Sequence, residues 1–224
     1  MDEVLDNAVW HALTTHHAEL AEVVGSARRY PPAVSSFTAV DELDADAWAS
    51  LAKFGASVVL FRDEIPVPPE GWKETGTGAG HQMVLETLAP VAEVPFEVLD
   101  PADAGDMLAL VEVSRPGPFE ARTVELGRYL GVRDGDGGLV AMAGERLHLP
   151  GFTEVSAVTT HPDARGRGYA AALTVEVCRG ILARGEVPVL HVAVGNDGAR
   201  RIYERLGFVE RRIVRFAILE PPAA

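Results

Sequence analysis

One stretch of the chain, residues 154–208, constrains the fold most, because it predicts strands and helices in alternation around a glycine-rich turn. Its first eight residues, Glu154-Val-Ser-Ala-Val-Thr-Thr-His161, are rich in β-branched side chains and precede a proline, which is typical of a mostly buried strand. Between Gly168 and Gly185 the apolar residues recur at helical spacing, with Arg184 before the closing glycine. A second strand begins near Val189 and a second helix follows Asn196, so the stretch indicates an α/β fold.

The glycine-rich turn opens the first of these helices and has the chemistry of an anion site. Unpaired backbone N–H groups and the positive end of the helix dipole meet at such a place and favour a phosphate or pyrophosphate. Gly166 and Gly168 leave room for a ligand to approach the backbone. Arg165 and Arg167 add positive charge there, and an arginine can fork onto phosphate oxygens.

Other interpretations of the turn fit less well. Gly166-x-Gly168-x-x-Ala171 satisfies a relaxed dinucleotide fingerprint, but His-Pro-Asp-Ala-Arg separates its first glycine from the end of the strand. A P-loop is excluded because no Gly-Lys-Ser/Thr follows. A plain glycine turn before a core helix would leave the residues after the second strand unexplained.

The residues Arg165-Gly-Arg-Gly-Tyr-Ala170 resemble the acyl-CoA pyrophosphate loop of the GCN5-related N-acetyltransferase (GNAT) superfamily, Gln/Arg-x-x-Gly-x-Gly/Ala. One strand later come Asn196 and, seven residues on, Tyr203 within "YxxLGF", which is similar to the second signature of that superfamily. The resemblance runs from about Phe96 to Leu219. It implies the GNAT acyl-CoA N-acyltransferase fold, an α/β (α+β) arrangement whose mixed, mainly antiparallel sheet has splayed central strands.

The resemblance also implies which residues bind the acyl donor. The backbone of Val158, Thr159 and Thr160 would pair with the pantetheine amides as an added strand would, and the N–H near Val158 would stabilise the oxyanion. Asn196 would cap the second helix and contact the pantetheine. The pyrophosphate would lie on Arg165, Gly166, Arg167, Gly168, Tyr169, Ala170 and Ala171.

Four residues are the candidates for proton transfer, one as the acid and three as the base. Tyr203 is in the position that the resemblance gives to the residue protonating the CoA thiolate; otherwise it is an aromatic core residue of its helix. Glu154 ranks first as the base that takes the proton of the acceptor amine. His191, whose ordinary pKa suits such a transfer, ranks behind it with His161, and a purely structural His191 stays an alternative.

The predicted function is an N-acetyltransferase that uses acetyl-CoA as co-substrate and lets an amine attack the thioester directly. A small-molecule amine is favoured over a protein as the acceptor. Two alternatives stay open: transfer of a longer acyl group, and a non-catalytic acyl-CoA sensor or interaction module. The oligomeric state is open as well, a homodimer included.

The predicted domain boundary lies in the proline-containing linker Ala89–Pro95, with an N-terminal α/β domain at residues 1–92 and the GNAT domain at 93–224. The first domain is either a degenerate copy of the same fold or an unrelated cap. In it we expect one or two helices over residues 2–30, a helix from Asp41 and a strand from Ala56 to Phe61. We expect a mobile loop at Glu74–His81, where three glycines alternate, and then a strand.

Charge and composition exclude several classes of protein. The net charge of −13 argues against general binding of nucleic acid. The excess of acidic residues is unevenly distributed along the chain, since residues 161–224 hold ten Lys and Arg against seven Asp and Glu. The basic part suits a polyphosphate ligand such as CoA, and the acidic part could suit a cationic acceptor, although an acidic surface is most often only a soluble one.

The remaining expectations concern location and metals. No apolar run has membrane-spanning length and the start of the chain is unlike a secretory signal, which predicts a cytoplasmic protein without a membrane partner. The single cysteine, Cys178, is expected to be a buried structural thiol. No metal site is expected among His11, His16 and His17, because a zinc site needs two histidines on one face and a further ligand nearby, whereas His16 and His17 are adjacent and point apart.

Overall fold

The structure, a computed structural model, describes residues 2–223 and contains one continuous sheet of eleven strands. These strands are β1 (Glu22–Val24), β2 (Ala27–Arg29), β3 (Phe37–Ala39), β4 (Val58–Arg62), β5 (Lys73–Leu85), β6 (Glu97–Leu99), β7 (Tyr129–Arg133), β8 (Leu139–Leu149), β9 (Phe152–Thr160), β10 (Val187–Ala193) and β11 (Phe208–Glu220). They lie in the order β1-β2-β3-β4-β11-β5-β10-β9-β8-β7-β6. Among the described residues, only the neighbours β3–β4 and β9–β10 are parallel, which confirms the predicted mixed, mainly antiparallel sheet.

The helices pack on both faces of this sheet. The α-helices are α1 (Ala8–Thr14), α2 (Ala45–Ala52), α3 (Ala104–Ser114), α4 (Tyr169–Ala183) and α5 (Asp197–Leu206). Short 3₁₀-helices are η1 (Asp2–Leu5), η2 (Ala18–Leu20), η3 (Pro101–Asp103), η4 (Thr123–Leu126) and η5 (Pro162–Ala164). Among the described residues, no helix has both the length and the apolar character needed to cross a membrane.

Alternation along the strands sends neighbouring side chains into separate cores. Leu130 of β7 joins the core under α4 and α5, whereas Tyr129 beside it joins the core under α3. The two cores therefore lie on opposite faces of the sheet. Cys178, fully buried in the first of them, is the expected structural thiol, and burial raises its pKa to about 12.

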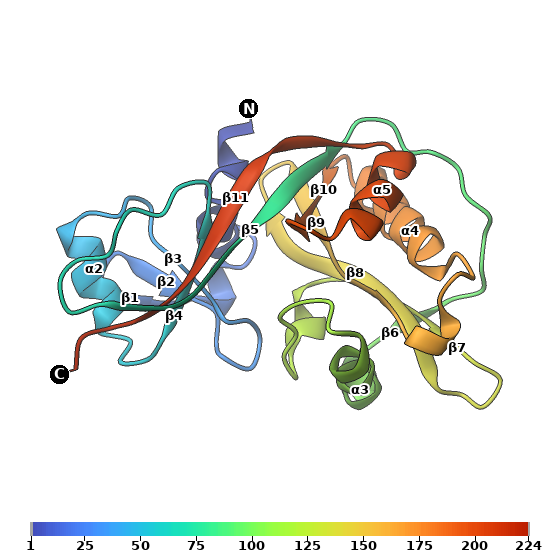
Figure 1. Cartoon of the computed structure of the whole chain (residues 1–224), viewed down its shortest axis with the longest axis horizontal. Helices are drawn as coiled ribbons and strands as arrows, with labels where there is room; N and C mark the ends of the chain where they lie inside the picture. Colours follow the sequence, from blue (N-terminus) through green and yellow to red (C-terminus); the bar gives the residue numbers. More distant parts are fainter. Residues whose placement is uncertain (1, 224) are drawn as a thin grey trace.

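Two long strands join the halves of the molecule (Figure 1). β11 pairs with β4 of the N-terminal half along its last residues and with β5 along its whole length. β5 precedes the predicted linker in the chain, yet it lies between β10 and β11, so the N-terminal half contributes a central strand to the C-terminal sheet. Residues 86–96 form neither helix nor strand. The boundary at residue 92 stays a prediction.

Two expectations for the N-terminal half were wrong. Residues 22–29, expected to be helical, form the hairpin β1–β2, because Gly25 adopts a φ of +56° and β2 then pairs with β3. Residues 74–81, expected to be a mobile loop, belong to β5. A Cβ on Gly78 would lie 2.4 Å from the ring of Phe216 in β11, so the alternating glycines form the strand face on which large side chains pack.

The central strands β9 and β10 separate part of the way along. They pair from Phe152–Val187 to Val155–Leu190, and no pairing between them follows among the described residues. β9 also bulges against β8, where Ala157 adopts a φ of +52°. A gap bounded by free backbone therefore opens between the two strands, as the resemblance implied.

Candidate active site

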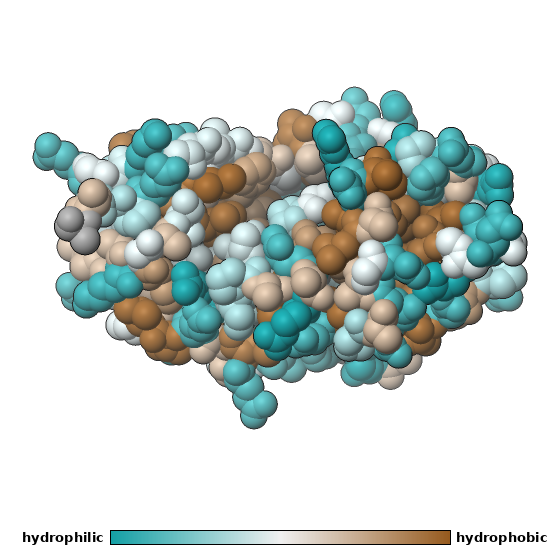
Figure 2. Space-filling model, turned by 90° about the horizontal axis from the view of Figure 1, so that it is seen from below, coloured by the Kyte–Doolittle hydropathy of each residue, from teal (hydrophilic) through white to brown (hydrophobic). Residues whose placement is uncertain are grey.

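A cavity of about 1030 Å³ occupies the gap between β9 and β10 and extends to the N-terminal half. The space-filling view from below shows the surface hollowed between the two halves, with hydrophobic residues on both sides (Figure 2). Every predicted site residue except Glu154 and the lower-ranked candidate His161 lines this cavity. The structure therefore brings together the loop, the strand edge, Asn196, His191 and Tyr203, which are spread over some 50 positions of the sequence.

The glycine-rich loop forms one end of the cavity. Gly168 caps α4 with a φ of +81°, and Gly166 adopts +78°. A Cβ at either glycine would meet no atom within 4 Å, so open space lies in front of the first N–H groups of α4. Arg165 and Arg167 are exposed and line the same end without an ion pair to any described residue. An anion is the ligand that this geometry favours.

The free edge of β9 forms the wall that leads away from the loop. Ala157 and Val158 have no Cα partner in β8, and beyond Val155 no described strand pairs with the other edge. The Oγ1 atom of Thr160 is buried in this wall without a hydrogen-bond partner among the described residues. An extended ligand with amide groups could add to this edge as a strand does.

The start of α5 and its second turn supply the opposite wall. Asn196 caps this helix, with its Oδ1 accepting a hydrogen bond from the backbone N–H of Ala199 at 3.3 Å. Tyr203 is 9% exposed and packs edge to face on Phe208. Burial raises the pKa of Tyr203 to about 12, so its hydroxyl stays protonated at neutral pH.

Glu154 lies behind the cavity wall in a buried ion pair. One carboxylate oxygen accepts from Nη2 of Arg146 at 2.6 Å and from Nδ1 of His191 at 2.8 Å, and the other accepts from Nε of Arg146 at 2.8 Å. Burial opposes ionisation of this carboxyl, but the Arg146 charge outweighs it and lowers the pKa of Glu154 to about 2. A carboxylate with this pKa and these partners is a weak base.

His191 connects this ion pair to the cavity. Its Nε2 lies 3.1 Å from Nε2 of Gln82, whose amide orientation is fixed because it also donates to the Leu5 carbonyl and accepts from Arg211. Gln82 therefore donates to Nε2, and His191 carries its proton on Nδ1, toward Glu154. Phe61 packs edge to face on the imidazole ring, with centroids 4.7 Å apart.

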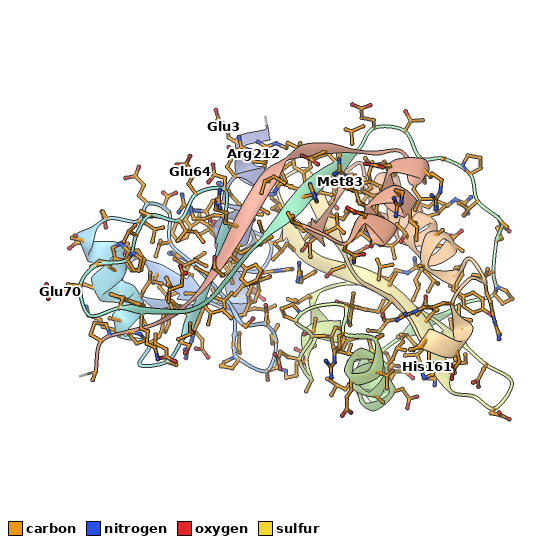
Figure 3. All side chains as sticks on the ribbon, viewed as in Figure 1. Glu3, Glu64, Glu70, Met83, His161 and Arg212 are labelled. Atoms are coloured by element: carbon orange, nitrogen blue, oxygen red, sulfur yellow. The ribbon has the colours of Figure 1, made fainter. Side chains whose placement is uncertain are left out.

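His161, the third candidate base, lies outside the cavity. It begins η5, its Nδ1 accepts from the N–H of Asp163 at 3.3 Å, and Figure 3 shows it at the outer side of the C-terminal half. It is therefore not among the residues that line the cavity with Tyr203 and His191. Its role as a base stays a prediction without support from this geometry.

One group of side chains outside the cavity has the composition of a metal site. Ligand atoms of His16, His148 and Glu186 lie within 4.8 Å of one another. The two imidazole rings stack, with their centroids 3.8 Å apart and an angle of 18° between their planes. Glu186 already accepts from His148 and from Thr153, each at 2.6 Å. This arrangement is that of a hydrogen-bonded cluster.

Two parts of the site were not predicted from the sequence. Arg146 carries no motif, although β8 and β9 form a hairpin in which an arginine can reach a glutamate eight residues later. The N-terminal half adds a hydrophobic wall that includes Phe37 and Phe61, stacked at 5.3 Å. No signal in the sequence links these phenylalanines to the glycine-rich loop, more than 100 positions away.

Comparison with known proteins identifies relatives of this chain in sequence and in structure. A family model of FR47-like proteins matches residues 129–217. The crystal structure of a protein described as a GNAT-family acetyltransferase from Novosphingobium aromaticivorans is 38% identical, with a TM-score of 0.88, over 98% of this chain and 99% of that one. A GCN5-related N-acetyltransferase from Kribbella flavida is 19% identical, with a TM-score of 0.63, over 99% and 95% of the two chains. None of the curated proteins matches.

Proposed function

Because this chain belongs to the GNAT family, as its 38% identity to a member over nearly the whole length of both chains shows, we propose that it transfers an acetyl group from acetyl-CoA to an amine. The predicted family and fold class are confirmed by this likeness. Acyl transfer in general follows from the family. The acetyl donor, the amine acceptor and the residue roles below are our proposal.

One observation carries the proposal: an open anion site and a buried, protonated tyrosine lie in the same cavity, on either side of a free strand edge. CoA needs these three features in this order, since its diphosphate, its amide-containing arm and its sulfur follow one another. Gly166 to Ala171 would hold the diphosphate, with Arg165 and Arg167 neutralising its charge. The edge from Val158 to Thr160 would bind the arm.

The chemistry then needs two proton movements. The amine nitrogen attacks the thioester carbonyl carbon, and the N–H near Val158 stabilises the developing oxyanion. The carbon–sulfur bond breaks, and the CoA thiolate takes its proton from the Tyr203 hydroxyl. The amine loses its proton to a base, and the products are an N-acetyl compound and CoA.

We assign the base to His191 and treat Glu154 as the residue that positions it. His191 lines the cavity, whereas Glu154 does not. The Nδ1–H donated to Glu154 holds the imidazole with Nε2 as the accepting atom, and the carboxylate stabilises the imidazolium that forms. The acceptor must displace the hydrogen bond that Gln82 donates to Nε2.

The proposal is tested by measuring thiol release from acetyl-CoA with a panel of amines, together with CoA binding by calorimetry. We expect CoA to bind and at least one amine to be acetylated. Binding of CoA without turnover on any amine would favour an acyl-CoA sensor, and turnover only with a longer acyl-CoA would correct the donor.

Tyr203→Phe tests the proton donor, and we expect it to lower kcat by about 100-fold with CoA affinity unchanged. The ring contact with Phe208 survives in this variant, so the melting temperature should hold. Tyr129→Phe is the matched control, because Tyr129 is also a buried tyrosine but does not line the cavity, and its hydroxyl has no hydrogen-bond partner among the described residues. Equal rates in the two variants would remove Tyr203 from the mechanism.

A further inference from the structure

The acceptor side of the cavity has a wall of its own, made by the N-terminal half and by the loop after α3. The side chains of this wall are mostly apolar. They include Phe37, Val59 and Phe61 from the N-terminal half, and Phe216 and Ile218 from β11. Phe61 contacts the His191 ring, so a ligand lying on this wall would reach the proposed base. The wall suits the apolar or aromatic body of a small molecule.

The charges around the cavity are of one sign. Among the described residues that line it there is no aspartate or glutamate, and the charged ones are Arg115, Arg146, Arg165, Arg167 and Arg205. The carboxylates that give the chain its net charge of −13 therefore lie elsewhere. A polycationic acceptor would enter a cavity that offers it arginines and no counter-charge, which disfavours binding.

Arg115 and Arg205 are the arginines that remain for an acceptor, and Arg205 lies in the last turn of α5, in the C-terminal half. Arg146 is paired to Glu154, and Arg165 and Arg167 flank the proposed diphosphate site. Arg115 is exposed, and its side chain has no hydrogen bond or ion pair to any described residue.

Arg115 stands at the start of a loop that leads from α3 to the N-terminal side of the cavity. It ends α3 in the left-handed region at a φ of +50°. The loop that follows is fixed to the N-terminal half, since Thr123 donates to the Val34 carbonyl at 2.7 Å and the N–H of Arg122 donates to Ala33 at 2.8 Å. This side is the one that carries Phe37.

We propose that the acceptor is a zwitterionic amine, an apolar or aromatic amino acid or a close analogue. Its body packs on Phe37 and Phe61, its carboxylate pairs with Arg115 as a forked hydrogen bond, and its amine faces the thioester beside His191. This inference rests on the proposed N-acetyl transfer and adds the class of acceptor to it.

The experiment compares matched amines as acceptors. Leucine, phenylalanine and tryptophan are measured against isoamylamine, phenethylamine and tryptamine, which lack the carboxylate, and against the polycation spermidine. We expect the amino acids to have the highest kcat/KM. In Arg115→Gln we expect their KM to rise about tenfold while that of the decarboxylated amines stays constant.

Arg128→Gln is the control, because Arg128 is exposed and outside the cavity, and it should leave every value unchanged. Binding of N-acetylphenylalanine and N-acetylphenethylamine to the CoA complex supplies a readout without turnover, and only the first should weaken in Arg115→Gln. Preference for spermidine, equal use of both members of each pair, or no effect of Arg115→Gln on the amino acids overturns the acceptor class. Failure of CoA itself to bind would instead overturn the proposed function.

Discussion

Gly168→Glu is expected to lower the affinity for CoA by about 1000-fold, the loss that two charge-assisted hydrogen bonds would produce. The new carboxylate would stand in front of the first N–H groups of α4, where the diphosphate is proposed to lie. Nothing lies within 4 Å of a Cβ at Gly168, so the side chain meets no clash. The cost to folding is the strain of a φ of +81° in a residue with a side chain, about 1–2 kcal/mol. Calorimetric titration with CoA measures the effect.

Gly151→Glu separates this effect from backbone strain. Gly151, in the turn between β8 and β9, has a φ of +80° and equally open space around a Cβ, but it does not line the cavity. The melting temperature of Gly151→Glu should fall by as much as that of Gly168→Glu, whereas its affinity for CoA should stay unchanged. Unchanged affinity in Gly168→Glu, or an equal loss in both variants, would mean that CoA is held elsewhere.

The C-terminal half could be predicted well because its signals are local. The strand, turn, helix, strand and helix between Glu154 and Phe208 each have a start and a stop in the sequence, and the structure has β9, α4, β10 and α5 there. The loop and Asn196 were located for the same reason, since a helix start determines what its own first turn exposes. Their proposed roles stay predictions.

The N-terminal half was predicted less well because its elements depend on distant partners. The glycines of residues 74–81 have the composition of a loop, and they form a strand because β11, some 140 positions later, pairs with them and packs Phe216 and Ile218 on them. Residues 22–29 likewise form strands because β3 is there to pair with them. In both places, pairing with another strand determines the structure against the local propensity of the residues.

The side-chain partners of the site residues could not be predicted from the sequence either. The resemblance predicts Glu154 as a base, because it places a glutamate that acts directly or through water at the start of the first splayed strand. The structure shows Arg146 bound to both of its oxygens and His191 to one, which changes the chemistry expected of the same residue. Its position in a motif predicted where Glu154 lies, but the side chains around it determine its charge and which groups it can contact.

Glu154→Gln is therefore expected to act first on stability, lowering the free energy of unfolding by about 3–5 kcal/mol, because it leaves the buried Arg146 charge without its counter-ion. Urea unfolding followed by circular dichroism measures this loss. Since the pKa of Glu154 is lowered to about 2, the pair contributes fully above about pH 4.5 and its contribution is lost as the pH falls toward 2. The loss in the variant should thus be constant from pH 5 to 8.

Glu125→Gln is the matched control, since Glu125 receives the same two bonds, from Nε and Nη2 of Arg122 at 2.7 Å each, at an exposed site. That variant should lose no more than about 1 kcal/mol. Arg146→Met combined with Glu154→Gln should recover part of the stability, because no unpaired charge remains inside. If the folded fraction of Glu154→Gln retains a pH-dependent rate of acetylation, shifted by the loss of the charge that stabilises the imidazolium, Glu154 is not the base, whereas a small stability loss with no pH dependence left would return the proton transfer to this carboxylate.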